Sequence, residues 1–330
     1  MVTSRDVARA ARVSQATVSR VLSGGVVSAD TRSRVLLAIA ETGYTPNTAA
    51  RTMRTGLTHT VGIVVADLEN PFYPAMLDAL TAAFARAGYR TVVWVASSTA
   101  NTAALDAIRQ RGVDGVVFTT VTEDSPELHG ALEGGSPVVL VNRALPGVDC
   151  DQVSSDNVAG ANLVADYFVS HGRTRIAFVG GTPRATTSQR RLAGFAERLA
   201  ELGHPLDPRL VIEGEYTYAS GRNSVERLLG AGLPVDAVFC SNDLLAFGAM
   251  DGARGLGVRV PEDVWLVGYD DIAMSDWGAY SLTTVRQDIV ETAELACRLL
   301  VSRVEGGPRE SVTRRFAPTL VVRGSTGFTA

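Results

Sequence analysis

Apolar residues in the first part of the chain recur at the spacing of an α-helix. Val7 and Ala11 lie on one face of a predicted helix over residues 5–11, which is too short to be stable alone and must pack on another element. A tight turn leads to a second predicted helix, and a third is predicted over residues 31–43. This order predicts a helix-turn-helix followed by its packing helix.

The second helix is expected to begin after Ser14, whose side-chain oxygen can accept a hydrogen bond from the free N–H groups. The residues expected to face inward are Ala16 or Thr17, Val18, Val21 and Leu22. The residues expected to stay exposed carry hydrogen-bonding groups and one cation: Gln15, Thr17, Ser19 and Arg20. An amide suits adenine and a guanidinium suits guanine in the major groove, so this is the predicted recognition helix. The alternative is a small helical subdomain with a solvated polar surface.

From about residue 58, continuous apolar runs alternate with helical segments. Such an order predicts parallel sheets covered on both faces. The predicted strands are residues 60–66, 91–96, 115–118, 137–142, 175–180, 237–240 and 264–268, with helices near 73–87 and 102–111. The units are about twice as many as one sheet uses, so two lobes are expected.

Charge divides the chain at the same place. Residues 1–60 hold eight arginines and three acidic residues, a net charge of +5, and the total of −4 leaves −9 for the remainder. A basic arm on an acidic body suits phosphate binding and argues against the solvated-surface alternative. No apolar run approaches the roughly 20 residues of a membrane helix, and the N-terminus lacks the apolar core of a signal peptide. We therefore expect a cytoplasmic, nucleoid-associated protein with no membrane partner.

The segment between the two parts has two interpretations. Pro46 stops the third helix, and Asn47 can cap a short helix that ends before Gly56. A helix this short needs a partner, which would be DNA or a second copy of the segment. The alternative is an ordinary interdomain linker.

Ligands of open parallel sheets bind at the carboxyl ends of the strands. The loops at those ends are residues 67–73, 142–143, 155–157, 180–191, 241–243 and 268–271. They are rich in amide, carboxylate and guanidinium groups, which bind vicinal hydroxyls or a base edge, and Phe72, Tyr73 and Tyr216 can stack on a sugar or base. The alternative is that Asp and Asn here cap the following helices, which we favour for Asp243 and Asp271.

Sequence motifs for catalysis are missing. There is no phosphate-binding Gly-x-x-x-x-Gly-Lys loop, no Gly-x-Gly-x-x-Gly after a strand and no Gly-x-Ser-x-Gly nucleophile elbow. We expect no cofactor and no enzymatic activity, so an α/β enzyme with a DNA-binding arm is disfavoured. A solute-binding protein without DNA function would have a signal peptide and no basic head, contrary to this sequence.

The first 56 residues contain a series of short motifs: Asp6-Val7-Ala8, Val13-Ser14, Ala16-Thr17-Val18-Ser19-Arg20-Val21-Leu22, Thr31-Arg32 and Gly43-Tyr44-Thr45-Pro46-Asn47. Through these motifs, residues 3–56 closely resemble the DNA-binding head of the lactose-repressor (LacI/GalR) family. The resemblance implies a hinge helix that folds on DNA, with Met53 as the minor-groove wedge, and base reading by Gln15, Ala16 and Arg20. The DNA-contacting positions that it implies are Arg5, Ser14, Gln15, Ala16, Thr17, Ser19, Arg20, Asn47, Ala50 and Met53.

The rest of the chain is similar to the periplasmic-binding-protein type I fold that this family carries. The resemblance implies an all-α helix-turn-helix head over residues 1–46, a hinge over 47–57 and a two-lobed α/β core over 58–330. It also implies three crossings between the lobes, with one lobe at about 60–157 plus 289–316. The ligand-binding positions that we expect are Phe72, Tyr73, Asp156, Arg191, Tyr216, Asn242, Asp270 and Gln287. Arg191 and Asp270 are expected to clamp hydroxyls from opposite sides of a pocket, with Tyr216 as the stacking platform.

The function implied is that of a ligand-responsive, sequence-specific transcriptional regulator. We expect a homodimer, with a tetramer as the alternative, on a pseudo-palindromic double-stranded DNA operator. It is expected to repress a carbohydrate-utilisation operon and to be released by a small sugar-like inducer. The alternative effector is a purine or nucleoside.

Overall fold

The computed structural model describes residues 2–327, apart from residues 23–24, 46–51, 53–55, 66, 96–97, 123, 233 and 309. The chain forms two compact units that divide after Thr58. We call the unit up to Thr58 the head and the unit from His59 the core. The predicted helix that starts at Asn47 falls almost entirely on residues outside this description.

The head contains three described helices, α1 (Ser4–Ala10), α2 (Gln15–Leu22) and α3 (Ala29–Thr42). They pack around small apolar side chains: Val7, Ala8, Ala11, Val18, Val21, Val35 and Ala38. Ser28 caps α3, since its Oγ accepts the Thr31 N–H at 3.2 Å, and Gly43 ends it in the left-handed conformation with φ 64°. Leu22 is 38% exposed, so the prediction that it faces inward is wrong.

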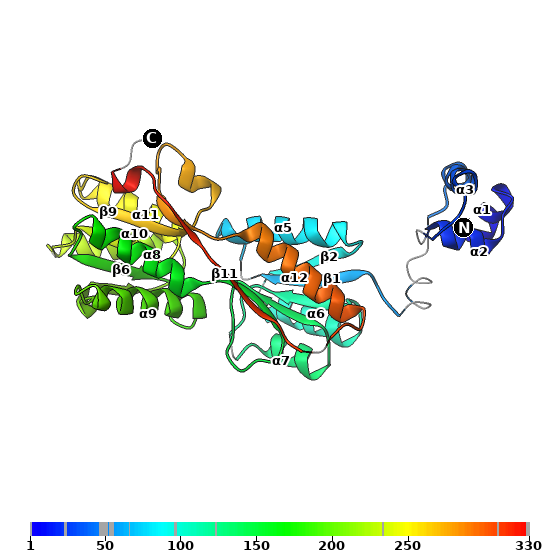
Figure 1. Ribbon diagram of the computed structural model, residues 1–330, viewed down its shortest axis with the longest axis horizontal. Helices are drawn as coiled ribbons and strands as arrows, with labels where there is room; N and C mark the ends of the chain where they lie inside the picture. The colour runs from blue at the N-terminus through cyan, green and yellow to red at the C-terminus, as the bar shows by residue number, and fades with distance from the viewer. Residues whose placement is uncertain are drawn as a thin grey trace. The chain divides into compact units, whose positions relative to one another are not determined.

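The core has two lobes, each built on a six-stranded sheet (Figure 1). The sheet of the first lobe has the order β11-β5-β4-β3-β1-β2, and its neighbouring strands pair in parallel throughout the described residues. The elements of this lobe are β1 (Thr60–Val65), α5 (Phe72–Arg86), β2 (Arg90–Val95), α6 (Ser98–Arg109), β3 (Gly115–Phe118), α7 (Pro126–Glu133), β4 (Val138–Val141), β5 (Asp151–Ser155), α12 (Ile289–Val304) and β11 (Thr313–Phe316).

The sheet of the second lobe has the order β12-β10-β9-β8-β6-β7, in which only the edge strand β12 pairs antiparallel among the described strands. The elements of this lobe are α8 (Asn157–Ser170), β6 (Ile176–Gly180), α9 (Thr186–Glu201), β7 (Val211–Glu213), α10 (Tyr218–Gly230), β8 (Ala237–Cys240), α11 (Asp243–Gly255), β9 (Trp265–Asp270), β10 (Thr283–Arg286) and β12 (Thr319–Val321). Short 3-10 turns lie at Pro208–Leu210, Ala273–Asp276 and Gly324–Thr326.

The chain passes between the lobes at three places, as the fold resemblance implies. The passages lie between β5 and α8, between β10 and α12, and between β11 and β12. Figure 1 shows the last of these as the red segment that contains β11. The all-α head and the parallel-sheet, two-lobed core confirm the predicted fold class.

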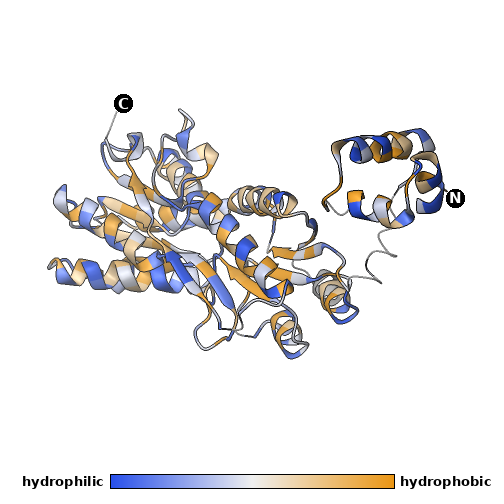
Figure 2. Ribbon diagram, turned by 45° about the vertical axis from the view of Figure 1, so that its right-hand side comes forward, coloured by the Kyte–Doolittle hydropathy of each residue, from blue (hydrophilic) through white to orange (hydrophobic). Residues whose placement is uncertain are grey.

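Strands inside the two sheets are buried along their whole length, because helices cover both faces. β1, β3, β4, β6, β8 and β9 contain no exposed position, and Figure 2 shows these strands largely in the hydrophobic colour. β2 differs because it is an edge strand, and Val92, Val93 and Val95 are 37–41% exposed. The prediction of a fully covered strand is therefore wrong for β2.

The sequence pattern also missed β5, which is buried although it is polar. The Asp151 carboxylate accepts two hydrogen bonds at 2.8 Å from the Arg303 guanidinium. The Gln152 amide bonds the backbone N–H and carbonyl of Leu145. Partners of this kind offset the cost of burying polar groups.

Candidate functional site

In the head, α2 has an exposed face that carries polar side chains. The Ser14 Oγ accepts the Thr17 N–H at 3.1 Å, as predicted for the capping residue. The side chains of Gln15, Ala16 and Arg20 are exposed, whereas Thr17 and Ser19 are half-buried. Val18 and Val21, on the opposite face of α2, pack in the core of the head. This packing holds α2 in place and leaves its polar face exposed, as base reading requires.

Hydrogen bonds within the head orient part of this face. The Gln15 Nε2 donates to Ser4 Oγ at 2.7 Å, and the hydroxyls of Ser14 and Thr17 lie 2.9 Å apart. Arg5, on α1, is exposed. The last three predicted DNA-binding residues, Asn47, Ala50 and Met53, lie outside the described residues.

In the core, a small pocket lies where loops from both lobes meet. Its lining residues are Asn70, Phe72, Tyr73, Asn142, Thr187, Arg191, Tyr216, Asn242 and Asp270. They follow β1, β4, β7 and β8, lie in the first turns of α9, or end β9, which is the carboxyl edge of each sheet. We call this space the inner pocket.

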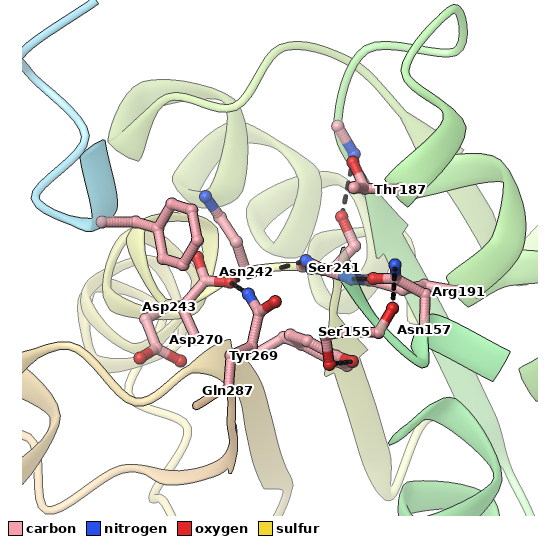
Figure 3. Close-up of polar contacts among 12 residues, drawn as sticks. Ser155, Asn157, Thr187, Arg191, Ser241, Asn242, Asp243, Tyr269, Asp270 and Gln287 are labelled. Atoms are coloured by element: carbon pink, nitrogen blue, oxygen red, sulfur yellow. Dashed lines mark hydrogen bonds and ion pairs between the residues drawn. The ribbon is translucent and has the colours of Figure 1, made fainter. Parts of the chain in front are cut away.

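Six of the eight predicted ligand-binding residues line the inner pocket, and Asp156 and Gln287 do not. Asp156 caps α8, since its Oδ1 accepts the Ala159 N–H at 3.0 Å. Gln287 contacts a lining residue instead: its Nε2 donates a hydrogen bond to Asp270 Oδ1 at 2.7 Å (Figure 3). Sequence reasoning thus chose one capping residue and one supporting residue in addition to lining residues.

Three lining residues were not among the predicted eight, although all lie in the loops identified at strand ends. Asn70 has its Oδ1 bonded to the Phe72 N–H at 3.1 Å, Asn142 adopts a left-handed φ of 69°, and Thr187 lies in the first turn of α9. Position after a strand was the signal that identified their loops. Choosing among the residues of each loop required the three-dimensional structure.

Arg191 is held in a fixed position within the second lobe. Its Nε donates to Asn157 Oδ1 at 2.7 Å, and its Nη1 donates to the Ser241 carbonyl. The guanidinium also lies over the Tyr269 ring, 3.5 Å from the ring centroid. Figure 3 shows these groups arranged around Arg191. Several fixed contacts hold the cation in one orientation, as recognition of a ligand requires.

Arg191 and Asp270 contact each other directly. Arg191 Nη1 lies 3.7 Å from Asp270 Oδ1, and the two side chains are 3% and 5% exposed. Both come from the second lobe, so the prediction that they face each other from opposite sides of the pocket is wrong.

Asp270 is one of two neighbouring buried carboxyls. Burial raises the pKa of Asp270 above its ordinary value, Arg191 opposes this shift and Asp243 adds to it. Burial also raises the pKa of Asp243, although donors from Ser275, Thr284 and the Ile272 N–H favour its ionised form. The backbone of Asp270 has a φ of 122°, a strained conformation of the kind found at functional sites.

The interpretation of Asp243 and Asp271 as helix caps is wrong. Asp243 bonds Ser275 Oγ at 2.6 Å and the Ile272 N–H at 3.0 Å, and Asp271 pairs with Arg286 and Arg323.

The cap of α11 is Asn242. Its Oδ1 accepts the Leu245 N–H at 2.9 Å. Its Nδ2 is buried without a hydrogen-bond partner in the described structure. An unpaired buried donor is costly, and this one belongs to a residue that lines the inner pocket, where a ligand oxygen would satisfy it.

The inner pocket is nearly filled by its own side chains. A free volume of about 20 Å³ remains, which is enough for about one water molecule. Phe72 and Tyr73 contact each other edge to face, and the Tyr216 hydroxyl lies 3.4 Å from Thr187 Oγ1. A ligand must therefore move side chains or separate the lobes to enter.

The described part of the chain shows neither a metal site nor a membrane span. No three His, Cys, Asp or Glu side chains there gather in a way that would hold a metal ion. Within the same residues, no helix has both the length and the apolar content that crossing a bilayer takes.

Comparison with known proteins gives matches along nearly the whole chain. A family model described as "Bacterial regulatory proteins, lacI family" matches residues 3–47, and one described as "Periplasmic binding protein-like domain" matches residues 165–326. The transcriptional regulator GalR of Escherichia coli is 34% identical over 329 residues, which cover 98% of this chain and 96% of GalR. The regulator CelR of Thermobifida fusca is 36% identical over 329 residues, covering 97% and 96%.

Solved structures agree with these matches. The lac repressor dimer bound to operator and the anti-inducer ONPF superposes with a TM-score of 0.85 at 26% identity, covering 98% of this chain and 99% of that one. The CelR–cellobiose complex superposes with a TM-score of 0.78 at 33% identity, covering 98% and 100%. These relatives are transcriptional regulators, not enzymes. The chain therefore belongs to the lacI family of bacterial regulatory proteins and is a ligand-responsive, DNA-binding transcriptional regulator.

Proposed function

We propose that this protein is a homodimeric repressor of a carbohydrate-utilisation operon that a small sugar-like inducer releases from DNA. The observation that carries the effector site is the unpaired, buried Asn242 Nδ2 at the inner pocket. Its neighbours there, Arg191 and Asp270, supply a donor fork and an acceptor. Sugar hydroxyls act as donor and acceptor at once, so such a set satisfies them.

Aromatic residues complete the case for a sugar. Phe72, Tyr73 and Tyr216 line the same pocket, and an aromatic face packs on the apolar face of a pyranose ring. The same rings would also stack on a purine, so a purine or nucleoside effector is the alternative. A solved relative supports the first choice, because that structure is a complex of CelR with cellobiose.

Repression is the proposed sign of regulation. A relative in Escherichia coli, 30% identical over 334 residues, is named the transcriptional repressor CytR, and the lac repressor is the dimer bound to operator. For this chain we propose a pseudo-palindromic operator, since a two-fold dimer presents two equivalent heads. Acting on DNA, the protein would work at the nucleoid, in the cytoplasm.

DNA reading is assigned to the exposed face of α2. Gln15 and Arg20 would supply hydrogen bonds to base edges, and Ala16 only a methyl contact. Their exposure and the packed opposite face of α2 support this role. The hinge roles of Asn47, Ala50 and Met53 rest on the family resemblance alone.

An inducer acts through its different affinities for two conformations of the protein. The inner pocket holds about 20 Å³, so a ligand that inserts between Arg191 and Asp270 binds a rearranged state. We propose that this rearrangement changes the spacing of the two heads, which weakens binding to a two-part operator.

The experiment that tests the proposal is a thermal-shift screen of the full chain with sugars, sugar phosphates, nucleosides and purines. A ligand present at a hundred times its Kd adds about 2.7 kcal/mol to the free energy of unfolding. Sugars that raise Tm and weaken binding to an operator selected from random DNA support the proposal. Stabilisation by nucleosides or purines alone would favour the alternative effector.

A further inference from the structure

The first turns of α9 separate two cavities. Thr187 and Arg191, four residues apart and so on one face of the helix, line the inner pocket. Thr186 and Gln189, three residues apart on another face, line a second cavity. The segment after β4 also contributes to both cavities, because Asn142 lines the inner pocket and Leu145 lines the second cavity.

We call this second cavity the outer cavity. Its described lining consists of Thr122, Asp124, Leu145, Arg184, Thr186 and Gln189. Its volume is about 250 Å³, against about 20 Å³ in the inner pocket. That volume approaches the range of about 300–1,000 Å³ in which small-molecule sites lie. In this conformation, most of the room beside α9 is therefore in the outer cavity.

The groups around the outer cavity suit a neutral, hydroxylated ring. Thr186 Oγ1 is buried without a hydrogen-bond partner in the described structure. Gln189 Nε2 donates to the Pro183 carbonyl at 2.8 Å, and the Oε1 of the same amide is an acceptor. Leu145, which is almost completely buried, adds an apolar side chain to the lining. Donors, acceptors and one apolar surface are what a pyranose ring needs.

Charge at the outer cavity argues against an anion. Arg184 forms an ion pair with Asp124, which joins the loop before α9 to the loop after β3. The single cation in the described lining is thus already paired with an acid. A phosphate placed here would meet the Asp124 carboxylate, whereas a neutral sugar would bond to either member of the pair.

We propose that the outer cavity is a second effector subsite, and that the effector is a disaccharide or another glycoside of that length. One ring occupies the inner pocket and the second ring passes Thr186 into the outer cavity. This inference rests on the proposed carbohydrate response and adds the size of the effector to it.

The test measures sugar binding to the full chain by isothermal titration calorimetry. The probes are cellobiose, maltose and melibiose, with glucose and galactose as their single rings and glucose 6-phosphate as the anionic comparison. We expect at least one disaccharide to bind at least tenfold more tightly than its component monosaccharides. The double variant T186V/Q189L, which removes the polar groups of the outer cavity, should abolish that tenfold preference.

Two matched variants control for general damage. Gln110→Leu makes the glutamine change at an exposed position outside both cavities and should keep the full preference. Thr186→Ser retains the hydroxyl and should keep it as well, whereas Thr186→Val should lower it. Operator binding by each variant reports that the chain is folded.

The following results would contradict the proposed second subsite. Monosaccharides that bind as tightly as every disaccharide would leave the carbohydrate response intact but refute the outer cavity. So would a preference that survives T186V/Q189L, or tighter binding of glucose 6-phosphate than of any disaccharide. If no sugar binds at all, the proposed carbohydrate response fails together with this inference.

Discussion

The guanidinium of Arg191 lies 3.7 Å from the carboxyl of Asp270, and both side chains are almost completely buried. A buried pair of this kind is tolerated only where further hydrogen bonds satisfy both members. Arg191 has Asn157 and the Ser241 carbonyl, and Asp270 has Gln287. These contacts hold both side chains in place, and we propose that the pair offers a donor and an acceptor to a ligand hydroxyl.

Replacing Asp270 with Asn tests this role. The amide has the same size and can still accept the bond from Gln287, but it is a weaker acceptor than a carboxylate. Because burial raises the pKa of Asp270 to about 8, the comparison is made at a pH above that value, where the carboxyl is ionised. A hydrogen bond to a charged group is worth about 1.5–3 kcal/mol, so we expect effector affinity to fall at least tenfold there. Titration calorimetry with the effector measures the loss, and binding to operator DNA should remain.

The matched control is Asp78→Asn, an exposed position on α5. It makes the same chemical change away from the inner pocket and should leave effector affinity unchanged. A full operator response to effector in D270N would place the ligand elsewhere.

The two buried carboxyls predict how stability changes with pH. Burial raises the pKa of Asp243 and Asp270 above the ordinary 3.8, so above that pH the folded protein retains protons that the unfolded chain has lost. Stability falls with rising pH wherever the folded state holds more protons. We therefore expect the free energy of unfolding to fall as pH rises from about 4 until both buried groups have ionised.

Comparison with Asp243→Asn isolates this effect. The variant removes one of the two groups and the repulsion that it exerts on Asp270, so the decline with pH should become shallower than in the unaltered chain. Urea unfolding at a series of pH values measures both slopes. Identical slopes in the two proteins would show that these carboxyls do not control the decline.

A third prediction concerns the buried polar strand β5. Asp151, 1% exposed, pairs with Arg303 and also accepts the Val312 N–H at 2.8 Å. Removing one partner from a buried ion pair costs about 3–5 kcal/mol, so Asp151→Ala should lower the free energy of unfolding of the core by about that amount. The control, Asp149→Ala, changes an exposed carboxyl two residues away. Denaturant unfolding measures the free energy of unfolding of both variants. Equal values would show that the Asp151–Arg303 pair does not stabilise the core.

The same strand explains why part of the fold escaped prediction. Apolar runs such as residues 60–66 predict a strand, because a strand that is buried on both faces has apolar side chains at nearly every position. The β5 sequence Asp-Gln-Val-Ser-Ser lacks that pattern, since its partners Arg303 and Leu145 lie elsewhere in the chain. For β2 the pattern was present, but its place at the sheet edge depends on strand order, which periodicity does not encode.

The candidate site divides along similar lines. Position after a strand identified the loops that form the inner pocket, because the carboxyl ends of parallel strands meet at one edge. Which residues of each loop line the pocket depends on the direction of their side chains. Asp156 caps α8 and Gln287 donates to Asp270, while Thr187 lines the pocket. Residue type alone does not separate these three roles.

The last prediction concerns base reading by α2. Arg20 is exposed on that helix, and the proposed role gives it hydrogen bonds to a base edge. Arg20→Ala should therefore weaken specific binding by about 1–3 kcal/mol and relax the preference at one base position in each half-site. Selection of operators from random DNA by the two proteins measures that preference. Arg9→Ala, an exposed arginine on α1 that pairs with Asp6, removes the same charge from the head. If Arg20 only attracts phosphates, both variants would weaken binding alike and leave the selected sequence unchanged, whereas base reading changes the selected sequence for Arg20→Ala alone.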